Sequence, residues 1–157
     1  MPIEKPHISK KEALILITRY CSAEEHCNSE VRERLNKYNI SENDVDEILE
    51  FLRQEKYIDE SRFSSAFVND KFRFNKWGKY KITYFLKHKQ IPETIISEAL
   101  QTIPDEDYQQ QLKNELQKKL KSLPNTDTHA LKGKLYRFAA SRGFENDLIL
   151  NTISEVL

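Results

Sequence analysis

The sequence predicts an all-α fold, built as an elongated, curved array of three tandem three-helix repeats. The first observation behind this prediction is composition, because the 157 residues include only three glycines, too few for a turn-rich β-sandwich or barrel. The second is that six apolar positions recur three times with the same internal spacing. The third is that a turn or capping residue interrupts each copy at the same point. Repeats of roughly fifty residues have little core of their own, so stacked neighbours are expected to supply part of the burial.

The three copies of the apolar pattern span most of the chain. The first copy contains Val31, Leu35, Ile40, Val45, Leu49 and Leu52. The second copy contains Ile82, Leu86, Ile91, Ile96, Leu100 and Ile103. The third copy contains Leu135, Ala139, Phe144, Ile149, Ile153 and Val156. Their spacing predicts two helices joined by a tight turn in every copy, and a further helix precedes each pair.

The first repeat is predicted to contain helices over 9–20, 23–38 and 42–55. The first of these helices places several apolar residues on one face, namely Ala13, Leu14, Leu16 and Ile17. Ser41 stands where it can cap the third helix, and Asp44 occupies the acidic position of a capping box. The turn between the second and third helices is therefore specified locally.

The second repeat is predicted to contain helices over 60–75, 79–90 and 92–102. The first of these helices presents an apolar face made of Phe63, Ala66, Phe67 and Phe74. Pro92 follows the tight turn and suits the first turn of a helix, where the missing amide hydrogen is not needed.

The third repeat is predicted to contain helices over 105–121, 127–142 and 145–156. The first of these begins with three acidic residues, which suit a helix N-terminus, and its apolar face is made of Leu112, Leu116 and Leu120. Gly143 stands at the end of the second helix, where glycine commonly terminates helices. The same turn therefore recurs in all three repeats.

These assignments divide the chain into a flexible N-terminal tail over 1–8 and three repeats over 9–58, 59–104 and 105–157. The longest apolar run, residues 13–17, is far too short to span a bilayer. No stretch has the flanks and cleavage site of a signal peptide. We therefore expect a monomer that is soluble and cytoplasmic, with no membrane partner.

Few residues suit catalysis or metal binding. Cys21, His26 and Cys27 are close in the sequence, but no second cluster offers the remaining ligands of a structural zinc site. The histidines are scattered, and none belongs to an arrangement that would activate a nucleophile. A glycine-rich phosphate loop is also absent from the sequence. The sequence therefore predicts two reduced, partly buried thiols, no metal, no cofactor and no enzymatic activity.

A basic segment stands out in a chain that has 25 acidic and 25 basic residues. From Lys71 to Lys89 every charged side chain is Lys or Arg, and aromatic residues are interleaved with them. Such a segment attracts acidic partners even when the net charge is zero. The candidate binding residues, named here the basic–aromatic strip, are Lys71, Arg73, Lys76, Trp77, Lys79, Tyr80, Lys81, Tyr84, Lys87 and Lys89.

The aromatic residues of the strip allow two interpretations. On a helical wheel, Tyr80, Tyr84 and His88 lie opposite the apolar face of their helix. Tyrosine beside Lys or Arg is favoured at protein interfaces and on surfaces that stack nucleic-acid bases. The alternative is a solvated helix face whose tyrosines pack against the neighbouring repeat. Trp77 likewise either adds contact area or joins the two flanking helices.

The residues from Tyr57 to Ile91 follow a recognisable order. The order begins with YIDESRF, which includes Tyr57, Ile58, Asp59, Arg62 and Phe63. It continues through Phe67, Val68 and Lys71 to WGK at 77–79. It closes with Ile82, Leu86, Lys89 and Ile91. This order resembles the central motif of the RecX family, the bacterial regulators of RecA. The flanking segments EVRERLNKYNISENDVDEIL and KLYRFAASRGFENDLILNTI resemble the other repeats of that family. The chain departs from the family at 76–80, which lacks the second glycine and the proline of a common Gly-Lys-Gly-Pro step.

The resemblance implies a regulatory protein that is not an enzyme. RecX-like proteins act in DNA repair, homologous recombination and the SOS response. The resemblance therefore implies that this chain binds the RecA–DNA filament and inhibits or modulates RecA recombinase, ATPase and coprotease activity, meeting single- or double-stranded DNA weakly or within the filament. Two alternatives stay open: a stand-alone helical nucleic-acid-binding protein, and a helical scaffold for another protein.

Overall fold

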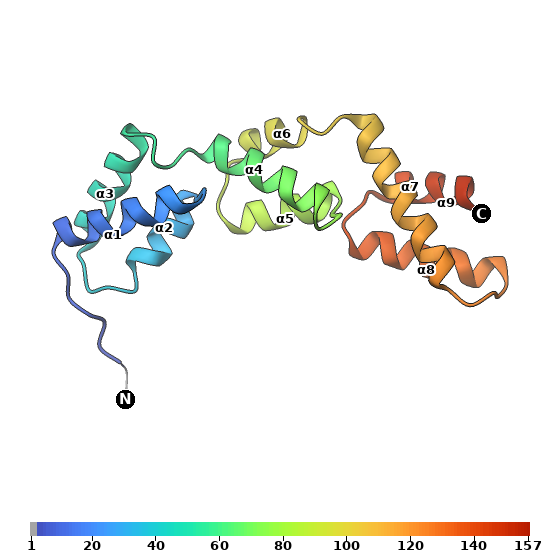
Figure 1. Ribbon diagram of the computed structural model, residues 1–157, viewed down its shortest axis with the longest axis horizontal. Helices are drawn as coiled ribbons and strands as arrows, with labels where there is room; N and C mark the ends of the chain where they lie inside the picture. The colour runs from blue at the N-terminus through green and yellow to red at the C-terminus, as the bar shows by residue number, and fades with distance from the viewer. Residues whose placement is uncertain (1–2) are drawn as a thin grey trace.

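The structure, a computed structural model, describes residues 3–157 and confirms the all-α prediction. These residues form no β-strand, and their helices are α1 (Lys10–Ala23), α2 (Asn28–Leu35), α3 (Glu42–Gln54), α4 (Glu60–Arg73), α5 (Lys79–His88), α6 (Glu93–Leu100), α7 (Asp105–Ser122), α8 (Thr128–Ser141) and α9 (Asn146–Val156). The helices pack in three consecutive groups, which we name unit 1 (α1–α3), unit 2 (α4–α6) and unit 3 (α7–α9). Figure 1 shows the three units following one another along an arch, so the elongated, curved array is confirmed as well.

Capping side chains begin several of these helices. Four N-cap residues accept a hydrogen bond from the backbone amide three residues further on, namely Ser9, Ser41, Asp59 and Asp127. These bonds satisfy amides that have no partner within the helix. At the end of α8, Gly143 adopts a positive φ of 91°, which confirms its predicted role in ending the helix.

The start of α2 differs from the sequence prediction. The second helix was expected from residue 23, but α1 continues to Ala23 and α2 begins only at Asn28. Cys27 is the N-cap, with extended backbone, and its amide donates a 3.4 Å hydrogen bond to the carboxylate of Glu30. Cysteine is not a common N-cap residue, so the helical period alone did not reveal this break.

The repeated apolar positions form the core. All of them are buried except three, which are half-buried: Ile40, Leu100 and Val156. Two other residues predicted to lie on apolar faces are exposed, since Leu16 exposes 43% of its surface and Phe74 exposes 78%. Phe74 is the C-cap of α4 and lies beyond its apolar face, where Phe72 is buried instead. Leu16 lies about 100° around α1 from the buried Ile17, which places it outside the buried face of the helix.

The segment before α1 contacts unit 1 through residues 6 and 7. The carbonyl oxygen of Pro6 accepts a 2.8 Å hydrogen bond from the amide of Asn39. His7 forms an isolated parallel β-bridge with the same residue. The predicted flexibility of residues 1–8 stays a prediction, and its first two residues lie outside the described part of the chain.

Units 2 and 3 share one hydrophobic core, whereas unit 1 has its own. Tyr108 on α7 joins the shared core by packing on Phe72 of α4 and on Phe144, which precedes α9. Its ring centroid lies 5.9 Å from that of Phe72 and 5.2 Å from that of Phe144. The boundary near residue 105 therefore divides two helical units without dividing the core.

The backbone also joins units 2 and 3. The amide of Gly78 donates to the carbonyl oxygen of Arg142 at 2.7 Å, and the amide of Tyr80 donates to the carbonyl oxygen of Gly143 at 2.9 Å. These amides belong to the N-terminal end of α5, and the carbonyls belong to the C-terminal end of α8. The first amides of α5 and the last carbonyl oxygens of α8 have no partner within their own helices, so these bonds satisfy both. The positive end of the α5 dipole also meets the negative end of the α8 dipole.

Two glycines make this close approach possible. A Cβ atom on Gly78 would overlap the backbone carbonyl of Gly143, and a Cβ atom on Gly143 would overlap Cβ of Lys81. Gly143 also requires its left-handed backbone conformation. Both glycines are therefore required by the contact between α5 and α8.

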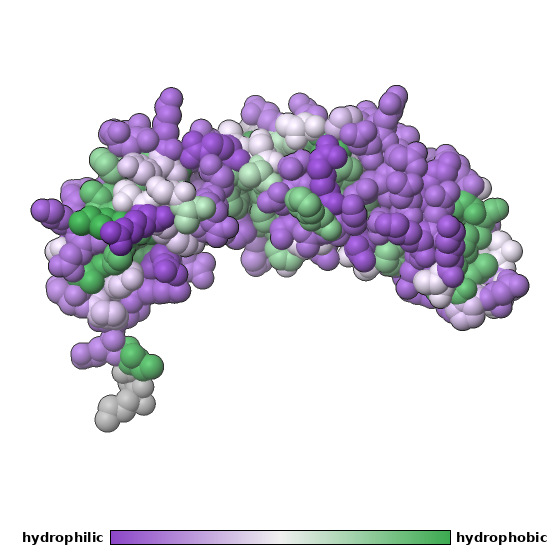
Figure 2. Space-filling model, viewed as in Figure 1, coloured by the Kyte–Doolittle hydropathy of each residue, from purple (hydrophilic) through white to green (hydrophobic). Residues whose placement is uncertain are grey.

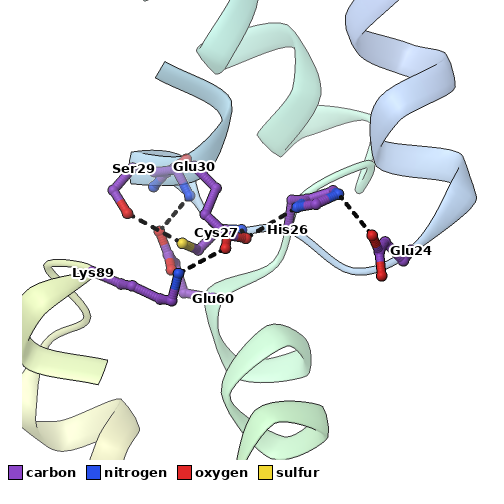
Figure 3. Close-up of polar contacts among 8 residues, drawn as sticks. Glu24, His26, Cys27, Ser29, Glu30, Glu60 and Lys89 are labelled. Atoms are coloured by element: carbon purple, nitrogen blue, oxygen red, sulfur yellow. Dashed lines mark hydrogen bonds and ion pairs between the residues drawn. The ribbon is translucent and has the colours of Figure 1, made fainter. Parts of the chain in front are cut away.

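The junction between units 1 and 2 is mainly polar (Figure 3). The amide of Asn28, at the start of α2, donates to Oε1 of Glu60 on α4 at 3.1 Å. Lys89 donates to Oε2 of Glu30 at 2.7 Å, which joins the end of α5 to α2. Cys27 adds the apolar part, because its side chain is buried against the core of units 2 and 3. Unit 1 is therefore attached through hydrogen bonds and ion pairs and only a small apolar contact.

Candidate interaction surface

The basic–aromatic strip follows a turn of the chain between α4 and α5. α4 ends at Arg73, and the chain then passes through Lys76, which has a positive φ of 60°. Gly78 is the N-cap of α5, and Lys89 is its C-cap, so α5 is shorter than the predicted helix over 79–90. Figure 1 places α5 toward the concave side of the arch. α5, the helix that carries Tyr80 and Tyr84, therefore lies on the concave side, and Figure 2 shows hydrophobic and hydrophilic residues side by side over this middle part of the arch.

Trp77 is the aromatic centre of the strip. Its ring lies 4.9 Å from that of Phe85 on α5, and its amide donates to the carbonyl oxygen of Lys71 on α4 at 3.0 Å. The ammonium groups of Lys71 and Lys81 lie 5.0 and 4.7 Å from the ring centroid. Trp77 is half-buried, so it joins the two helices and also holds two cations at the surface.

The two tyrosines of α5 are not used for packing between units. Tyr80 exposes 63% of its surface and Tyr84 exposes 59%. Tyr84 stacks on His88 at 5.3 Å and meets the edge of Phe85 at 5.4 Å, so Tyr84, Phe85 and His88 form an aromatic ridge on α5. The interpretation that these tyrosines pack against a neighbouring unit is therefore wrong. The ridge has the residue types that are enriched at protein interfaces.

Three of the strip's seven cations have acidic partners. Lys87 pairs with Glu93 at 3.1 Å, and Lys89 pairs with Glu30 at 2.7 Å. Arg73 is placed more loosely, with 3.9 Å between its guanidinium and the carboxylate of Asp107. The fields of these cations are partly offset by their partners, which leaves them less available to a ligand.

The other four cations have no acidic partner within residues 3–157, and they are Lys71, Lys76, Lys79 and Lys81. The side chain of Lys76 donates to the carbonyl oxygen of Arg73 at 2.6 Å. The ammonium group of Lys79 lies over the ring of Tyr108 at 4.7 Å. These four side chains therefore form the part of the strip whose charge is uncompensated, although they are half-buried along their stems.

A cleft of about 570 Å³ borders the strip where unit 2 meets unit 1. Its aromatic lining includes Phe67, Trp77 and Phe85, and its charged lining includes Glu30 and Lys89. The cleft continues the aromatic ridge toward α2. It therefore enlarges the surface that a partner of the strip can contact.

The pKa of Glu30 reflects its place between the side chains of Lys89 and His26 (Figure 3). Burial alone would raise this pKa, but hydrogen bonds from Lys89 and His26 outweigh it and hold the pKa below its ordinary value. His26 is buried, stacks on Tyr20 at 3.7 Å and places Nδ1 3.0 Å from the Glu30 carboxylate. Glu60, at the same junction, has its pKa raised by burial.

Two features of this surface were missed from the sequence. Phe74 was assigned to the apolar face of α4, yet it lies exposed beside Arg73. The helix-ending residues between Asn75 and Gly78 were the available signal that Phe74 follows the helix. The contact of Glu30 with Lys89 was not expected from the sequence. The spacing of Cys27 and Glu30 indicates a capping box, but no sequence pattern near Glu30 indicates a bond to the distant lysine.

The two cysteines lie outside the basic–aromatic strip. Cys21 and Cys27 are free thiols, as predicted, and both are buried; burial raises the pKa of Cys21 to about 11. Within residues 3–157, no group of three or more His, Cys, Asp or Glu side chains is placed to hold a metal ion. None of the helices in the described residues combines the length and apolar character needed to cross a membrane.

Comparison with known families matches two units of the chain. Residues 59–100 match the second three-helix domain of RecX, and residues 105–153 match the third three-helix domain of RecX. A protein of Chlorobium phaeobacteroides named regulatory protein RecX is 36% identical over 146 residues, which cover 93% of this chain and 94% of that relative.

The chain belongs to the RecX family.

RecX proteins of other lengths and solved RecX structures are similar too. A regulatory protein RecX of Clostridium botulinum is 32% identical over 130 residues, and the match covers 82% of this chain but only 60% of that relative. The crystal structure of RecX from Lactobacillus salivarius has a TM-score of 0.85 at 20% identity, and the alignment covers 94% of this chain and 96% of that one. A second structure, of a regulatory protein RecX, also has a TM-score of 0.85. The arched array of three units is thus the RecX fold.

Proposed function

We propose that this chain binds the RecA–DNA nucleoprotein filament through the basic–aromatic strip and inhibits or modulates RecA recombinase, ATPase and coprotease activity. The observation that carries the proposal is the meeting of four uncompensated lysines with two exposed tyrosines on α5 and at the end of α4, and α5 lies toward the concave side of the arch. The relatives of this chain are named regulatory proteins, and this naming supports a regulatory role.

The strip combines the chemistry that such a filament requires. Exposed tyrosine rings supply contact area against protein at a low cost in side-chain entropy. Uncompensated lysines attract acidic protein surfaces and the phosphates of DNA. The elongated shape allows contacts with more than one subunit of a helical filament, so a monomer suffices for binding.

In this proposal the protein acts by binding rather than by catalysis, and it needs no cofactor or metal. The strip contains no nucleophile placed beside a base: Tyr84 stacks on His88, and the cations rest on aromatic rings or backbone oxygens. Modulation of RecA would follow from preferential binding to one state of the filament.

A pair of double variants tests the strip. Tyr80→Ala with Tyr84→Ala removes the two exposed rings and should weaken inhibition of RecA ATPase by about tenfold or more, since central aromatic anchors often carry binding energy. Ile15→Ala with Leu16→Ala is the matched control, because those side chains expose 49% and 43% of their surface on α1 of unit 1. The proposal fails if both double variants fold and inhibit RecA ATPase as strongly as the unaltered protein.

A further inference from the structure

The junction of units 1 and 2 contains buried polar atoms that have no hydrogen-bond partner. Within residues 3–157 there are five such side-chain atoms, and all of them lie on the α1–α2 connection, the start of α2 or the start of α4: Oε2 of Glu25, Nε2 of His26, Oδ1 of Asn28, Oε2 of Glu60 and Oγ of Ser64. Glu25 and His26 also line the cleft of about 570 Å³ between the two units. Buried polar atoms are nearly always paired, so their gathering at one junction indicates a local demand for hydrogen bonds.

The missing groups are hydrogen-bond donors. Carboxylate and amide oxygens only accept hydrogen bonds. In a neutral His26 ring the hydrogen lies on Nδ1, because Nδ1 faces the carboxylate of Glu30 at 3.0 Å and that carboxylate cannot donate. Nε2 is then an acceptor as well, and it faces the carboxylate of Glu24 at 4.0 Å (Figure 3). His26 exposes only 8% of its surface, so water in bulk does not satisfy this nitrogen.

The charges at this end of the cleft favour a cation. Three carboxylates line it, those of Glu24 and Glu25 from the α1–α2 connection and that of Asp70 from α4. Arg62 donates to Oε1 of Glu25 at 2.6 Å, but Oε2 of the same carboxylate stays unpaired. Glu24 and Asp70 are both exposed, and Asp70 has no ion pair within residues 3–157. Acceptors and negative charge are therefore found together.

The opposite wall of the cleft is aromatic and suits the methylene chain of an organic cation. Phe67, Trp77 and Phe85 line this wall. The ammonium group of Lys71 already lies 5.5 Å from the ring centroid of Phe67 and 5.0 Å from that of Trp77, so these rings accept an alkylammonium group. A second ammonium on the same rings would be repelled by Lys71, which directs the charge of a ligand toward the carboxylates instead.

Other small ligands fit these residues less well. Among the described residues, no group of three or more His, Cys, Asp or Glu side chains is placed to hold a metal ion. An anion would bring further acceptors to atoms that already lack donors. A neutral apolar molecule would leave those atoms unpaired, which costs free energy.

We propose that this cleft binds a primary alkylammonium group, with the ammonium at Glu24, Glu25 and His26 and the methylene chain on the aromatic wall. An ammonium group supplies three donors and a compact positive charge. Two sources carry it, a free linear polyamine and the lysine side chain of a partner protein. The ligand contacts both units, so it also holds unit 1 against unit 2 where their own contact is mainly polar.

Trp77 provides the readout, because it is the only tryptophan of the chain and lines the cleft. Spermidine and, separately, Nα-acetyl-lysine N-methylamide are titrated into the full chain at constant ionic strength while the fluorescence of Trp77 is followed. A saturable change is expected. A response to one probe identifies its source of the ammonium group, and a response to both shows that either source fits. The absence of a saturable response to both probes would overturn the site.

Variants of the lining distinguish an ammonium site from a site for anions. Glu24→Gln with Asp70→Asn should weaken binding of the probe about fivefold or more, because two attractive charges are lost. Lys71→Gln should tighten it about twofold or more, because a like charge is removed from the aromatic wall. The matched control is Glu55→Gln with Glu98→Gln, which removes the same charge from exposed positions outside the cleft.

The assay contains neither RecA nor DNA, so its result is independent of the regulatory function proposed above. Weaker binding in Lys71→Gln would refute an ammonium ligand, since an anion responds in that direction. Equal losses in the cleft variant and the control would show an effect of net charge and would refute a local site.

Discussion

The phenol oxygen of Tyr108 accepts a 2.9 Å hydrogen bond from the backbone amide of Lys79 and donates one to the carboxylate of Glu145. Tyr108 belongs to the first helix of unit 3, and Lys79 is the first residue of α5 in unit 2. The equivalent amide of unit 1, that of Asn28, is capped by Glu60 from the first helix of unit 2. At both junctions the next unit thus caps the second helix of the preceding one.

The two junctions nevertheless differ in strength. Tyr108 is buried within the core shared by units 2 and 3, and the glycine contact between α5 and α8 lies beside it. The junction of unit 1 depends on carboxylates that are only half-buried. We therefore expect units 2 and 3 to unfold together and unit 1 to respond separately to pH and salt.

The first prediction concerns the three glycines. Gly78→Ala and Gly143→Ala should each lower the free energy of unfolding by about 2 kcal/mol or more, because the added Cβ would overlap atoms of the facing helix end. Gly133→Ala is the matched control and should raise the free energy of unfolding by roughly 0.5–1 kcal/mol, because alanine favours a helix interior more than glycine does. A Cβ atom at Gly133, within α8, would meet only the end of the Arg137 side chain, at 3.4 Å. Urea unfolding followed by circular dichroism measures all three. A Gly78→Ala protein as stable as the Gly133→Ala protein would contradict the contact between α5 and α8.

The second prediction concerns the hydroxyl group of Tyr108. Tyr108→Phe keeps the ring between Phe72 and Phe144 but removes both hydrogen bonds, which leaves the amide of Lys79 and the carboxylate of Glu145 without this partner. The free energy of unfolding should fall by about 1–3 kcal/mol. Tyr136→Phe is a control, because its hydroxyl is bonded to Asn146 near the surface and its loss should change stability by less. The order of the two variants in thermal unfolding checks this prediction.

The third prediction concerns pH at the junction of units 1 and 2. The pKa of Glu30 is lowered in the folded protein, so its stabilising effect is complete above its ordinary pKa of 4.5 and is lost as pH falls through the lower folded value. The pKa of Glu60 is raised by burial, so its charged form costs stability near neutral pH, and that cost disappears as pH falls.

Glutamine variants separate these two effects. Glu30→Gln should lower stability at about pH 7 by roughly 1 kcal/mol and reduce the loss of stability on acidification. Glu60→Gln keeps an acceptor for the amide of Asn28 and should leave stability at about pH 7 unchanged or raised. Urea unfolding at neutral and acidic pH compares the two. Variants that respond with the same sign would refute the opposite environments of these carboxylates.

The fourth prediction concerns which cations of the strip bind. Lys76→Gln with Lys81→Gln removes two uncompensated charges, and Arg73→Gln with Lys87→Gln removes two that lie near Asp107 and Glu93. The first pair should weaken binding to the RecA–DNA filament by about tenfold and reduce its salt dependence, and the second should weaken it less. Filament binding at several salt concentrations, with helicity checked by circular dichroism, measures both. A larger effect from the paired cations would show that the contacts lie elsewhere on the strip.

The sequence by itself determined the helices and their grouping. The period of positions such as Ile82 and Leu86 is local information, because residues four apart meet on one helix face in any context. Ser41 and Gly143 likewise act on backbone groups within a few residues of themselves. Three repeats of such local signals sufficed to predict the all-α, elongated array of helical repeats.

Only the tertiary structure decided which helix ends meet and which charges stay free. Glu30 and Lys89 are fifty-nine residues apart, and no periodic pattern couples them, yet their ion pair removes Lys89 from the uncompensated cations. Phe74 has an apolar side chain of the kind that fills protein cores, but it follows the last residue of α4 and is exposed to solvent. The hydrogen bonds of a helix join residues that are close in the sequence. The exposure of a side chain and the compensation of its charge depend instead on which residues pack against it in space. Only the packing of the units brings those residues together.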